Sequence, residues 1–587
     1  APEIQPAEGQ MSSKPRNRAM WLRVAVFAFA VMSFAGPQVS AQAVYQALQE
    51  REKVTSPVRS AQVLPDGLTE AIDSLYSAFA LENNLPGISY GIIIDMALVY
   101  TGNCGFYDLA GSRPVTPSTA FRAASMTKSF TALAILKLRD EGKLGLDDPV
   151  QIYLPELKNL KYLTQDAPVL TIRHLLTHTG GFPQDDPWAD RQLETTDEEL
   201  DAILAEGVSM SNVPGISYEY SNLGYTLLGR VIKAVSGESY QEYVAENIFK
   251  PLGMTSTVWE YTDLPDGVMA HGYRYLNGEW SEEALLHDGP FGAMGGLIST
   301  VGDFARYAIM HLSAWPAGSG PDDGSTGDGP DDRYSGSVAG DCPDGSTPEE
   351  GLAVRSTNER LAGGGPDDRP VKRSTLREMH SPSSGVAHSS SILYPGGSDC
   401  NVTVAYGYGL RWSLDCMGRR KIYHNGGLPG FGSNWTIMPD YGIGVVAFSN
   451  RTYGSTWAVN QKVLDLIIDG MKMLPRAITV SDILRTRMNE LVRILPGWDV
   501  TGSESIFADN FFADYYIDEL QARSTRIFRE AGEIAHIREL IPENNLRGSF
   551  VMEGKNGSIT VGFTLTPEAT PRIQSFSIVF TPNSSEK

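Results

Sequence analysis

Ser125 and Lys128 form a pair of chemically reactive residues in the segment Ser125-Met126-Thr127-Lys128. Residues three apart lie on one face of a helix, so both side chains can point into the same cleft. A serine hydroxyl becomes a good nucleophile only when a neighbouring base takes its proton. The spacing therefore predicts a serine nucleophile activated by a lysine. A lone copy of the pattern also fits a helix-capping serine beside a solvated lysine.

The residues that follow predict where this pair lies. From Phe130 to Leu138 the chain is apolar at most positions, which is typical of a buried helix. Gly142 marks the expected end of that helix. We therefore expect the pair at the start of a buried helix, where the partial positive charge of the helix N-terminus favours an oxyanion.

Two later motifs supply partners for this chemistry, Tyr220-x-Asn222 and His424-x-Gly426. Alone, a tyrosine is a packing residue, but beside a serine–lysine pair it becomes a candidate proton-transfer group. Lysine and tyrosine both have free pKa values near 10, and burial or a nearby charge can lower either one. The sequence leaves open whether Lys128 or Tyr220 is the general base.

A second pair, His174 and His178, has the i, i+4 spacing of two metal ligands on one helix face. The glutamate of the HExxH motif is missing, and no third ligand follows. The favoured interpretation is a helix that ends at Gly180 and Gly181 with hydrogen-bonded histidines. We therefore predict no metal and no cofactor.

Length and composition limit the function. The chain has 587 residues, enough for two or three domains, with 42% hydrophobic and 20% charged residues. The formal net charge of −22 argues against a nucleic-acid partner or an anionic membrane surface. The expected partner is a small-molecule or peptide substrate, and the oligomeric state stays open.

The N-terminal segment predicts export. Residues 1–41 are interpreted as a leader, in which an extension precedes Met11, a basic region and the apolar run 24–35. Small residues before Gln42 resemble a cleavage site, so the segment is typical of a secretory signal peptide. The expected location is periplasmic or secreted, with an uncleaved membrane anchor as the alternative. Residues 42–65 are interpreted as a linker.

Export permits disulfide bonds among the four cysteines. Cys400 and Cys416 flank a strand-like stretch and could pair. Four cysteines allow three connectivities, and the spacing alone does not choose among them.

Composition also divides the rest of the chain. We expect a main domain over 66–473, with a helix over 66–84, strands over 87–100, a polar surface-helix region over 183–213 and a hairpin series before a helix over 457–473. A Gly-, Pro-, Asp- and Ser-rich insertion, 317–370, interrupts it and repeats Gly-Pro-Asp-Asp. Residues 475–587 predict a separate, smaller α+β domain, with helices over 480–529 and strands between 546 and 580.

Longer stretches around the motifs resemble the serine β-lactamase-related family, which includes class C β-lactamases, penicillin-binding proteins, D-aminopeptidases and type VIII-like esterases. The stretches are 121–128 (FRAASMTK), 175–181 (LLTHTGG), 424–427 (HNGG) and 430–432 (GFG). The resemblance implies an α+β fold of the β-lactamase/transpeptidase type, in which helices flank an antiparallel sheet and a helical lobe completes the active site. The C-terminal domain lies outside this resemblance and faintly resembles cystatin-like accessory domains.

The resemblance also implies roles in catalysis. Ser125 would be the acylated nucleophile. Lys128 and Tyr220 would share its proton and later pass it to the leaving group. Asn222 would orient Lys128 and the substrate amide.

Strand residues would complete the site. His424 and Gly426 would line the cleft from the edge strand, and the backbone N–H groups of Ser125 and Gly427 would form the oxyanion hole.

One departure from the family pattern bears on the substrate. Penicillin-processing relatives usually carry Lys-Thr-Gly where this chain has His424-Asn425-Gly426. Histidine is mostly neutral at pH 7, so it offers a substrate carboxylate no permanent cation. This weakens a β-lactamase or DD-carboxypeptidase function and suits esterase- and aminopeptidase-like members better.

The sequence therefore predicts an exported serine hydrolase that acts through an acyl-enzyme on an ester or amide. The open alternatives are a carboxylesterase and a peptidase for linear or D-residue-containing oligopeptides, the linearised-microcystin type included. A non-catalytic binding protein that kept the fold is a further alternative.

Overall fold

A computed structural model describes residues 64–315, 369–393, 399–476, 478–495, 497–502 and 504–583. The predicted leader (1–41), nearly all of the linker (42–65) and nearly all of the insertion (317–370) lie outside these residues. No helix within the described ranges is long and apolar enough to cross a membrane.

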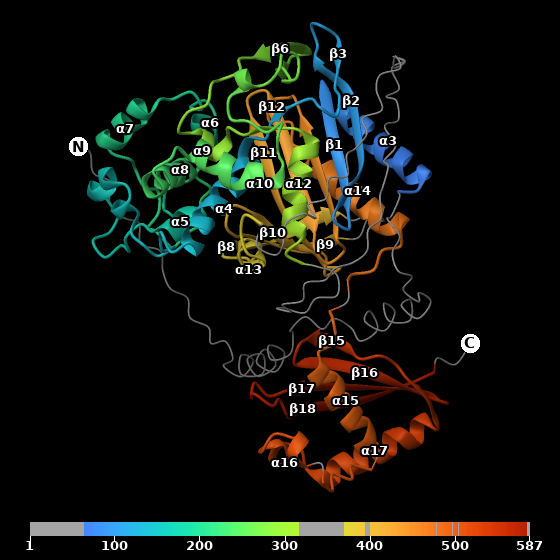
Figure 1. Cartoon of the computed structure of the whole chain (residues 1–587). Coiled ribbons are helices and arrows are strands. Elements are labelled where there is room, and N and C mark those ends of the chain that lie inside the picture. Colours follow the sequence, from blue (N-terminus) through green and yellow to red (C-terminus); the bar gives the residue numbers. More distant parts are fainter. Residues whose placement is uncertain are drawn as a thin grey trace, which may run out of the picture. The chain divides into compact units, whose positions relative to one another are not determined.

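A nine-stranded antiparallel sheet organises residues 64–476 (Figure 1). The N-terminal hairpin β1–β2 pairs with β13, the last strand of the chain's later hairpin series. The two ends of this region are therefore joined in one sheet. In sheet order the strands are β3 (Arg113–Pro114), β2 (Ala97–Asp108), β1 (Gly87–Ile94), β13 (Ile443–Ser449), β12 (Phe431–Met438), β11 (Arg420–Leu428), β10 (Arg411–Leu414), β9 (Asp399–Tyr406) and β8 (Ser384–Leu393).

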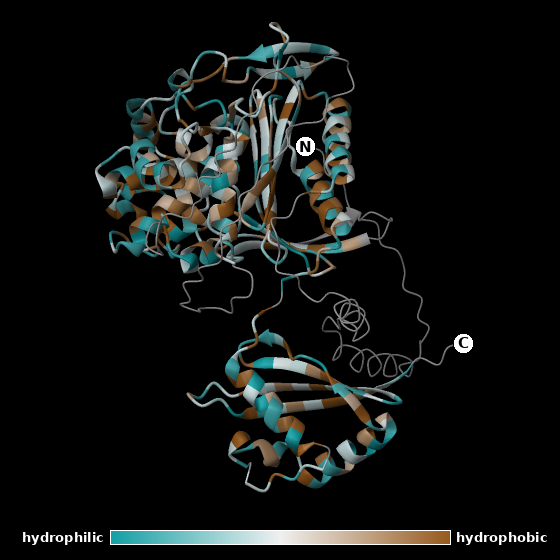
Figure 2. Cartoon of the chain, turned by 45° about the vertical axis from the view of Figure 1, so that its right-hand side comes forward, coloured by the Kyte–Doolittle hydropathy of each residue, from teal (hydrophilic) through white to brown (hydrophobic). Residues whose placement is uncertain are grey.

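Helices α3 (Asp66–Glu82) and α14 (Trp457–Gly470) cover one face of the sheet. In α3 the buried residues recur every four positions, at Leu68, Ile72, Tyr76 and Ala80, which places them on one side of the helix. They form a hydrophobic cluster with α14 and with residues of β1 and β13. Figure 2 shows apolar residues along these helices where they face the sheet.

The opposite face packs against α12 (Val301–Leu312) and the helical lobe. At the centre of this lobe lies α4 (Thr127–Asp140), which is buried through Leu136, as the mostly apolar run predicts. It ends at Asp140, and Gly142 adopts a positive φ of 72° just beyond. The other lobe helices are α5 (Ile172–Leu176), α6 (Asp186–Ala189), α7 (Asp197–Glu206), α8 (Asn222–Ser236), α9 (Tyr240–Val244) and α11 (Gly292–Gly295).

The prediction of a polar surface-helix region over 183–213 is wrong for the first part of that range. Asp190 and Leu193 are buried, at 2% and 3% exposure. The segment around α6 folds inward because Asp185 binds the N-terminus of α8 through two backbone N–H groups. Only α7 and the residues around it fit the expectation of an exposed, charged helix.

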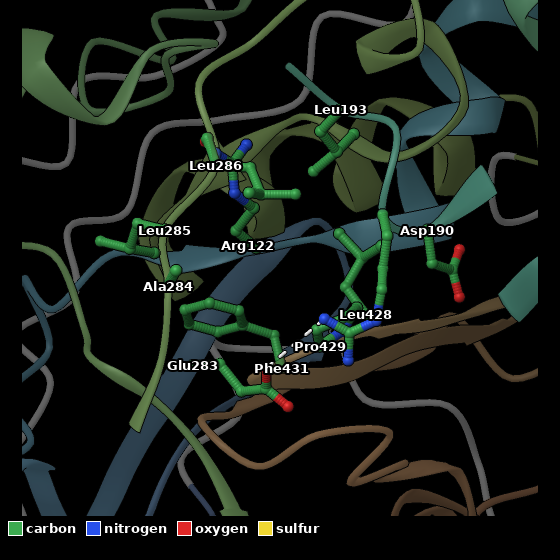
Figure 3. Close-up of a pocket in the computed structure, with 11 residues that line it drawn as sticks. Arg122, Asp190, Leu193, Glu283, Ala284, Leu285, Leu286, Leu428, Pro429 and Phe431 are labelled. Atoms are coloured by element: carbon green, nitrogen blue, oxygen red, sulfur yellow. Dashed lines mark hydrogen bonds and ion pairs between the residues drawn. The ribbon is translucent and has the colours of Figure 1, made fainter. Parts of the chain in front are cut away.

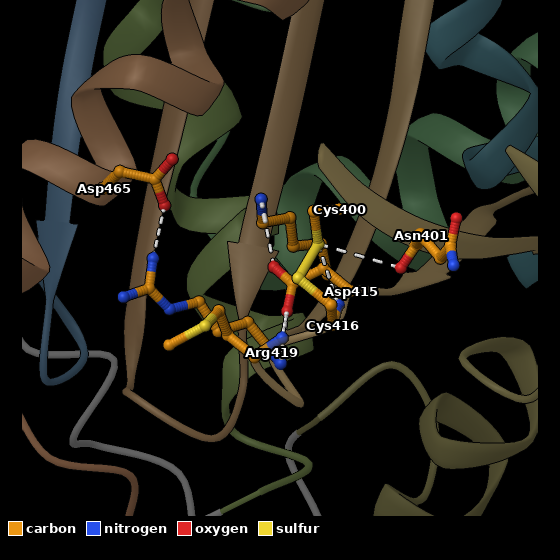
Figure 4. The surroundings of a disulfide bond; sticks show 8 residues. Cys400, Asn401, Asp415, Cys416, Arg419 and Asp465 are labelled. Atoms are coloured by element: carbon orange, nitrogen blue, oxygen red, sulfur yellow. Dashed lines mark hydrogen bonds and ion pairs between the residues drawn. A yellow bond between two sulfur atoms is a disulfide. The ribbon is translucent and has the colours of Figure 1, made fainter. Parts of the chain in front are cut away.

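A disulfide joins Cys400 of β9 to Cys416 in the loop after β10, which is the pairing that the flanking positions suggested (Figure 4). The same loop is held by charges, since Arg419 donates to Asp465 of α14 at 2.8 Å. These links fix the start of β11, the strand that carries the His-x-Gly motif.

Residues on the two sides of 316–368 meet in a buried network. His311 of α12 and His380, just after α13 (Arg373–Met379), lie 2.8 Å apart between ring nitrogens. Trp315 Nε1 donates to the other nitrogen of His380, also at 2.8 Å. Residues before 316 and after 368 are therefore in direct contact with each other.

The C-terminal region, 478–583, contains a second sheet and its own hydrophobic cluster. Helices α15 (Asp482–Ile494) and α17 (Ile517–Ala531) and strands β16 (Arg547–Gly554), β17 (Gly557–Leu565) and β18 (Ile573–Pro582) match the expected elements within a few residues. Two short strands, β14 (Ile534–Ile537) and β15 (Ile541–Asn544), were not expected. Both pair with β16 and contain no buried residue, so neither shows the apolar alternation that marks a strand.

Candidate active site

Ser125 lies in a tight turn at the start of α4. Residues 124–126 form a 3-10 turn, and Ala124 has a φ of 51°, a left-handed conformation that costs a non-glycine residue of order 1–3 kcal/mol. Neighbouring elements hold the turn in place. Ala123 N donates to Leu297 O at 2.7 Å, and Ser433 Oγ of β12 donates to Ala123 O at 2.8 Å.

Lys128 is fully buried beside the serine. Its Nζ lies 3.1 Å from Ser125 Oγ, 2.6 Å from Asn222 Oδ1 and 2.7 Å from Met294 O. These three partners match the three protons of an ammonium group. The structure thus brings together Ser125, Lys128 and Asn222, as the motifs predict.

The surroundings tune the lysine. Burial lowers the pKa of Lys128 to about 8, because the charged form loses its hydration. The carboxylates of Asp186, Asp190 and Asp185 act in the opposite direction and limit that fall. Lys128 is therefore a group that can gain and lose a proton close to neutral pH.

Tyr220 lies against this pair, with its ring centroid 4.9 Å from Lys128 Nζ. Burial raises the pKa of Tyr220 well above its usual value, and Tyr406 adds to that rise. A hydrogen bond with Ser125 and the charge of Arg411 oppose it. The tyrosine is thus a neutral phenol at physiological pH, in contact with Ser125.

Asn222 is fixed at the start of α8 by two neighbouring aspartates. Its backbone N–H donates to Asp185 Oδ1 at 2.6 Å, and Leu223 N donates to the other carboxylate oxygen at 2.8 Å. Its Nδ2 donates to Asp186 Oδ1 at 3.2 Å, while its Oδ1 accepts from Lys128. The side-chain amide therefore holds the lysine in one orientation.

His424 is buried on β11 and is held by neutral groups. Its Nδ1 lies 2.6 Å from Asn425 O and its Nε2 lies 3.1 Å from the Tyr406 hydroxyl. A carbonyl only accepts, so the proton resides on Nδ1 and Nε2 accepts from the tyrosine. Burial and the nearby charge of Arg411 lower the pKa of His424 well below its usual value, which keeps the ring neutral.

Gly426 and Gly427 bring β11 close to the serine turn. A Cβ atom at Gly426 would lie 2.3 Å from Ala123 O and 2.0 Å from Ser433 Oγ, so only glycine fits. At Gly427 a Cβ atom would lie 3.0 Å from the ring of Tyr453. The strand therefore runs past the nucleophile as the motif requires, and the use of Gly427 N–H in an oxyanion hole stays a prediction.

Comparison with known proteins agrees with this arrangement. The model of the beta-lactamase family matches residues 68–467. The chain belongs to the beta-lactamase family. The match includes every motif residue named above, and the fold is the α+β fold that the motifs imply. Members of this family are serine hydrolases.

Individual relatives align with the chain at modest sequence identity. The chain is 34% identical to protein flp of Staphylococcus aureus over 205 residues, which are 35% of this chain and 41% of that protein. It is 26% identical to beta-lactamase-like protein 4 of Dictyostelium discoideum over 397 residues, 66% of this chain and 59% of that protein. The matches thus span less than two thirds of these relatives.

Similar solved structures are a penicillin-binding protein homologue from Pyrococcus abyssi and a class C beta-lactamase. The first is 21% identical with a TM-score of 0.48, and the alignment covers 88% of this chain and 96% of that one. The second is 18% identical with a TM-score of 0.49, covering 69% and 98%.

His174 and His178, whose spacing could have suggested a metal site, form separate hydrogen bonds in this structure. His174 Nδ1 accepts from Thr171 N and caps α5. His178 is buried, and its Nδ1 accepts from Ser221 N at 3.1 Å. Within the described residues no group of three or more metal-ligating side chains is present.

Sequence reasoning missed Arg411 of β10. Its guanidinium carbon lies 5.7 Å from the ring centroid of Tyr220 and 6.0 Å from that of Tyr406. No carboxylate within the described ranges forms an ion pair with it. The structure therefore places a permanent cation beside His424, on the next strand. A lone arginine in the strand-like stretch 404–412 was the available signal.

The three aspartates near Lys128 were missed as well. Asp185 and Asp186 hold Asn222, while Asp190 accepts from the Tyr453 hydroxyl at 2.9 Å. Burial raises the pKa of Asp190 to about 7, with smaller opposing effects from Tyr453 and Lys128. No spacing rule links these residues to the serine, because their segment reaches the site only through the tertiary fold.

Proposed function

We propose that this chain is a serine hydrolase that transfers an acyl group from an ester or amide to Ser125 and then to water. The observation that carries the proposal is the buried Lys128 amine, 3.1 Å from Ser125 Oγ and held by two further oxygen atoms. Membership of the beta-lactamase family supports the reaction class.

In the proposed acylation step Lys128 is the general base. A neutral amine keeps two protons, which it donates to Asn222 Oδ1 and Met294 O because both are acceptors only. Its lone pair then points at Ser125 Oγ and takes the hydroxyl proton as the oxygen attacks the substrate carbonyl. The backbone N–H groups of Ser125 and Gly427 are the proposed donors to the resulting oxyanion.

Tyr220 completes the proton path in this proposal. Its phenol is neutral, contacts both Ser125 and Lys128, and can give its proton to the leaving group while it regains one from Lys128. Collapse of the tetrahedral intermediate breaks the ester or amide bond and leaves the acyl group on Ser125. Water then attacks the acyl-enzyme and releases the acid, with the same groups accepting and returning the proton.

Arg411 favours a peptide with a free carboxylate on the leaving-group side. The neutral His424 by itself weighs against carboxylate binding, but the guanidinium beside Tyr220 supplies the cation from the neighbouring strand. Our first candidate is therefore a peptidase for small linear peptides, including D-residue peptides. A carboxylesterase is the second candidate, since an activated ester needs no such cation. We further propose that the protein acts after export.

Purified wild type and Ser125→Ala are incubated with p-nitrophenyl acetate, with L- and D-aminoacyl p-nitroanilides, with small peptides ending in a free or amidated carboxyl group, and with nitrocefin. We expect turnover by wild type only, and faster cleavage of free-carboxylate peptides. Equal release by both proteins would contradict the proposed function. Cleavage of the ester but of no peptide or anilide would favour the carboxylesterase over the peptidase.

A further inference from the structure

A cavity lies beside the β11–β12 hairpin (Figure 3). It encloses about 420 Å³, part of it open to solvent, and its walls are mostly apolar. Leu193 and Asp190 come from the segment after α6, Leu285 and Leu286 from the segment after β6 (Glu279–Glu283), and Leu428 and Phe431 from the β11–β12 hairpin. This volume lies near the lower end of the range for small-ligand sites, roughly 300–1,000 Å³.

Two residues connect the cavity to the catalytic groups. Leu428 directly follows Gly427 on β11, and Asp190 is one of the carboxylates that act on Lys128. The Tyr453 hydroxyl donates to Asp190 while its ring lies against Gly427. The cavity therefore adjoins Gly427, whose backbone N–H is a proposed oxyanion donor.

The position of Tyr220 decides which part of the substrate enters the cavity. Tyr220 and Arg411 lie toward the first half of β11, where Arg411 pairs with Tyr423. A leaving group protonated by Tyr220 must extend in that direction. The cavity lies past the other end of the strand, at Leu428, so it receives the acyl part.

Four charged side chains line the cavity, two cations (Arg122 and Arg191) and two acids (Asp190 and Glu283), and they leave Asp190 to receive an amine on that acyl part. The guanidinium of Arg122 is held by two backbone carbonyls, Gly296 O and Leu286 O. Glu283 is neutralised by Arg274, whose Nε lies 2.6 Å away, and by Arg191 at 3.6 Å. Asp190 has a hydroxyl donor but forms no ion pair with any described residue. It is therefore the one acidic wall group, among the described residues, whose carboxylate has no cation in contact.

We propose that this cavity is the subsite for the N-terminal residue of the substrate, with an apolar side chain against the leucines and a free α-ammonium at Asp190. The proposal rests on the proposed function and narrows it to an aminopeptidase-type cleavage of small peptides or amino-acid amides. The bond that breaks joins this residue to the leaving amine, and water supplies the new carboxyl oxygen.

The test compares leucine, N-acetyl-leucine and glycine p-nitroanilides, as both enantiomers where chiral. Wild type is measured beside Asp190→Asn, Ala284→Trp, Ser125→Ala and the control Ala202→Trp. Ala284 is an exposed residue of the cavity rim, and Ala202 is equally exposed on α7. We expect wild type to prefer the free amine over the acetylated substrate at least ~10-fold in kcat/KM.

Asp190→Asn and Ala284→Trp should each change one ratio of kcat/KM values. Asp190→Asn should abolish the preference for the free amine, and Ala284→Trp should lower leucyl cleavage at least ~5-fold more than glycyl cleavage. Ala202→Trp should leave both ratios unchanged. Two results would overturn this inference but not the proposed function. One is Ser125-dependent cleavage with no preference for the free amine. The other is Ser125-dependent cleavage in which Ala284→Trp leaves the ratio of leucyl to glycyl cleavage unchanged. Absence of Ser125-dependent cleavage of any ester or amide would overturn the proposed function together with this inference.

Discussion

The region 64–476 and the region 478–583 differ in what they bury. The first buries charged and polar side chains beside its nucleophile, among them Lys128, Asp190 and His424. The described part of the second has a mainly apolar core, and its buried polar side chains belong to Arg487, Ser524 and Thr566. Burying polar groups is costly, so their concentration around Ser125 supports the proposal that this is the active site.

The buried polar groups of the C-terminal region act as structural links. Ser524 Oγ accepts from Trp498 Nε1 at 2.7 Å, and Arg487 Nε donates to Pro571 O at 2.9 Å. Each pair joins two segments of the region. The comparison predicts that substitutions in the first region change the reaction, whereas equivalent substitutions in the second change stability alone.

The largest expected effect follows from loss of the lysine amine. Lys128→Met should lower the acylation rate at least ~1,000-fold, because the serine then has no base in contact. The matched control is Lys137→Met on the same helix, where the lysine forms only an i, i+4 pair with Glu141. Stopped-flow acylation with p-nitrophenyl acetate measures both, and similar rates for the two variants would contradict the role of Lys128.

Tyr220→Phe tests the proton path with a smaller expected loss. Removal of a general acid typically costs at least ~100-fold, so kcat should fall about 100-fold, which is less than the loss expected for Lys128→Met. Tyr218→Phe is the control, because the Tyr218 hydroxyl is buried and has no hydrogen-bond partner among the described residues. A fall in kcat that is equal in both variants would show that the loss comes from packing rather than from proton transfer.

A pair of core substitutions sharpens the comparison between the regions. Phe130→Ala and Phe550→Ala each remove a fully buried ring and should each cost about 3–5 kcal/mol of unfolding free energy. Phe130 is part of α4, so its loss should also reduce activity per folded molecule. Phe550 belongs to the C-terminal cluster, and its loss should not. Denaturant unfolding and active-site titration separate the two quantities, and reduced activity per folded molecule in Phe550→Ala would contradict this division.

The pH dependence gives the smallest expected effect. If neutral Lys128 is the base, its folded-state pKa of about 8 makes the active fraction rise with pH and level off above 8. That fraction changes about 50-fold between pH 6 and pH 8. A pH profile of kcat/KM for p-nitrophenyl acetate measures it. A rate that is flat over this range would exclude Lys128 as the titrating base.

The serine, lysine, tyrosine and asparagine of the candidate site could be named from the sequence because each lies in a short motif, and the structure brings them together. The buried helix α4 and the order of the later strands were also predictable, since apolar runs report burial directly. The residues that escaped prediction reach the site through tertiary contacts. Arg411 lies on a strand beside the motif strand, and Asp190 follows a short helix that looked exposed.

His424 gives a second example of what a sequence motif cannot predict. Its neutrality follows from its type and, in the structure, from two neutral partners. The conclusion that the site lacks a cation did not follow, because the neighbouring strand provides one 5.7 Å from the Tyr220 ring. A motif reports its own residues and says nothing of what packs against them.

The most direct test of the account is the covalent intermediate itself. Wild type and Ser125→Ala are mixed with p-nitrophenyl acetate, quenched with acid within the first turnover and analysed by intact and peptide mass spectrometry. The account predicts one acetyl group per wild-type molecule, located on Ser125, and none on the variant. An acetyl group on another residue of wild type, or the same adduct on both proteins, would contradict it.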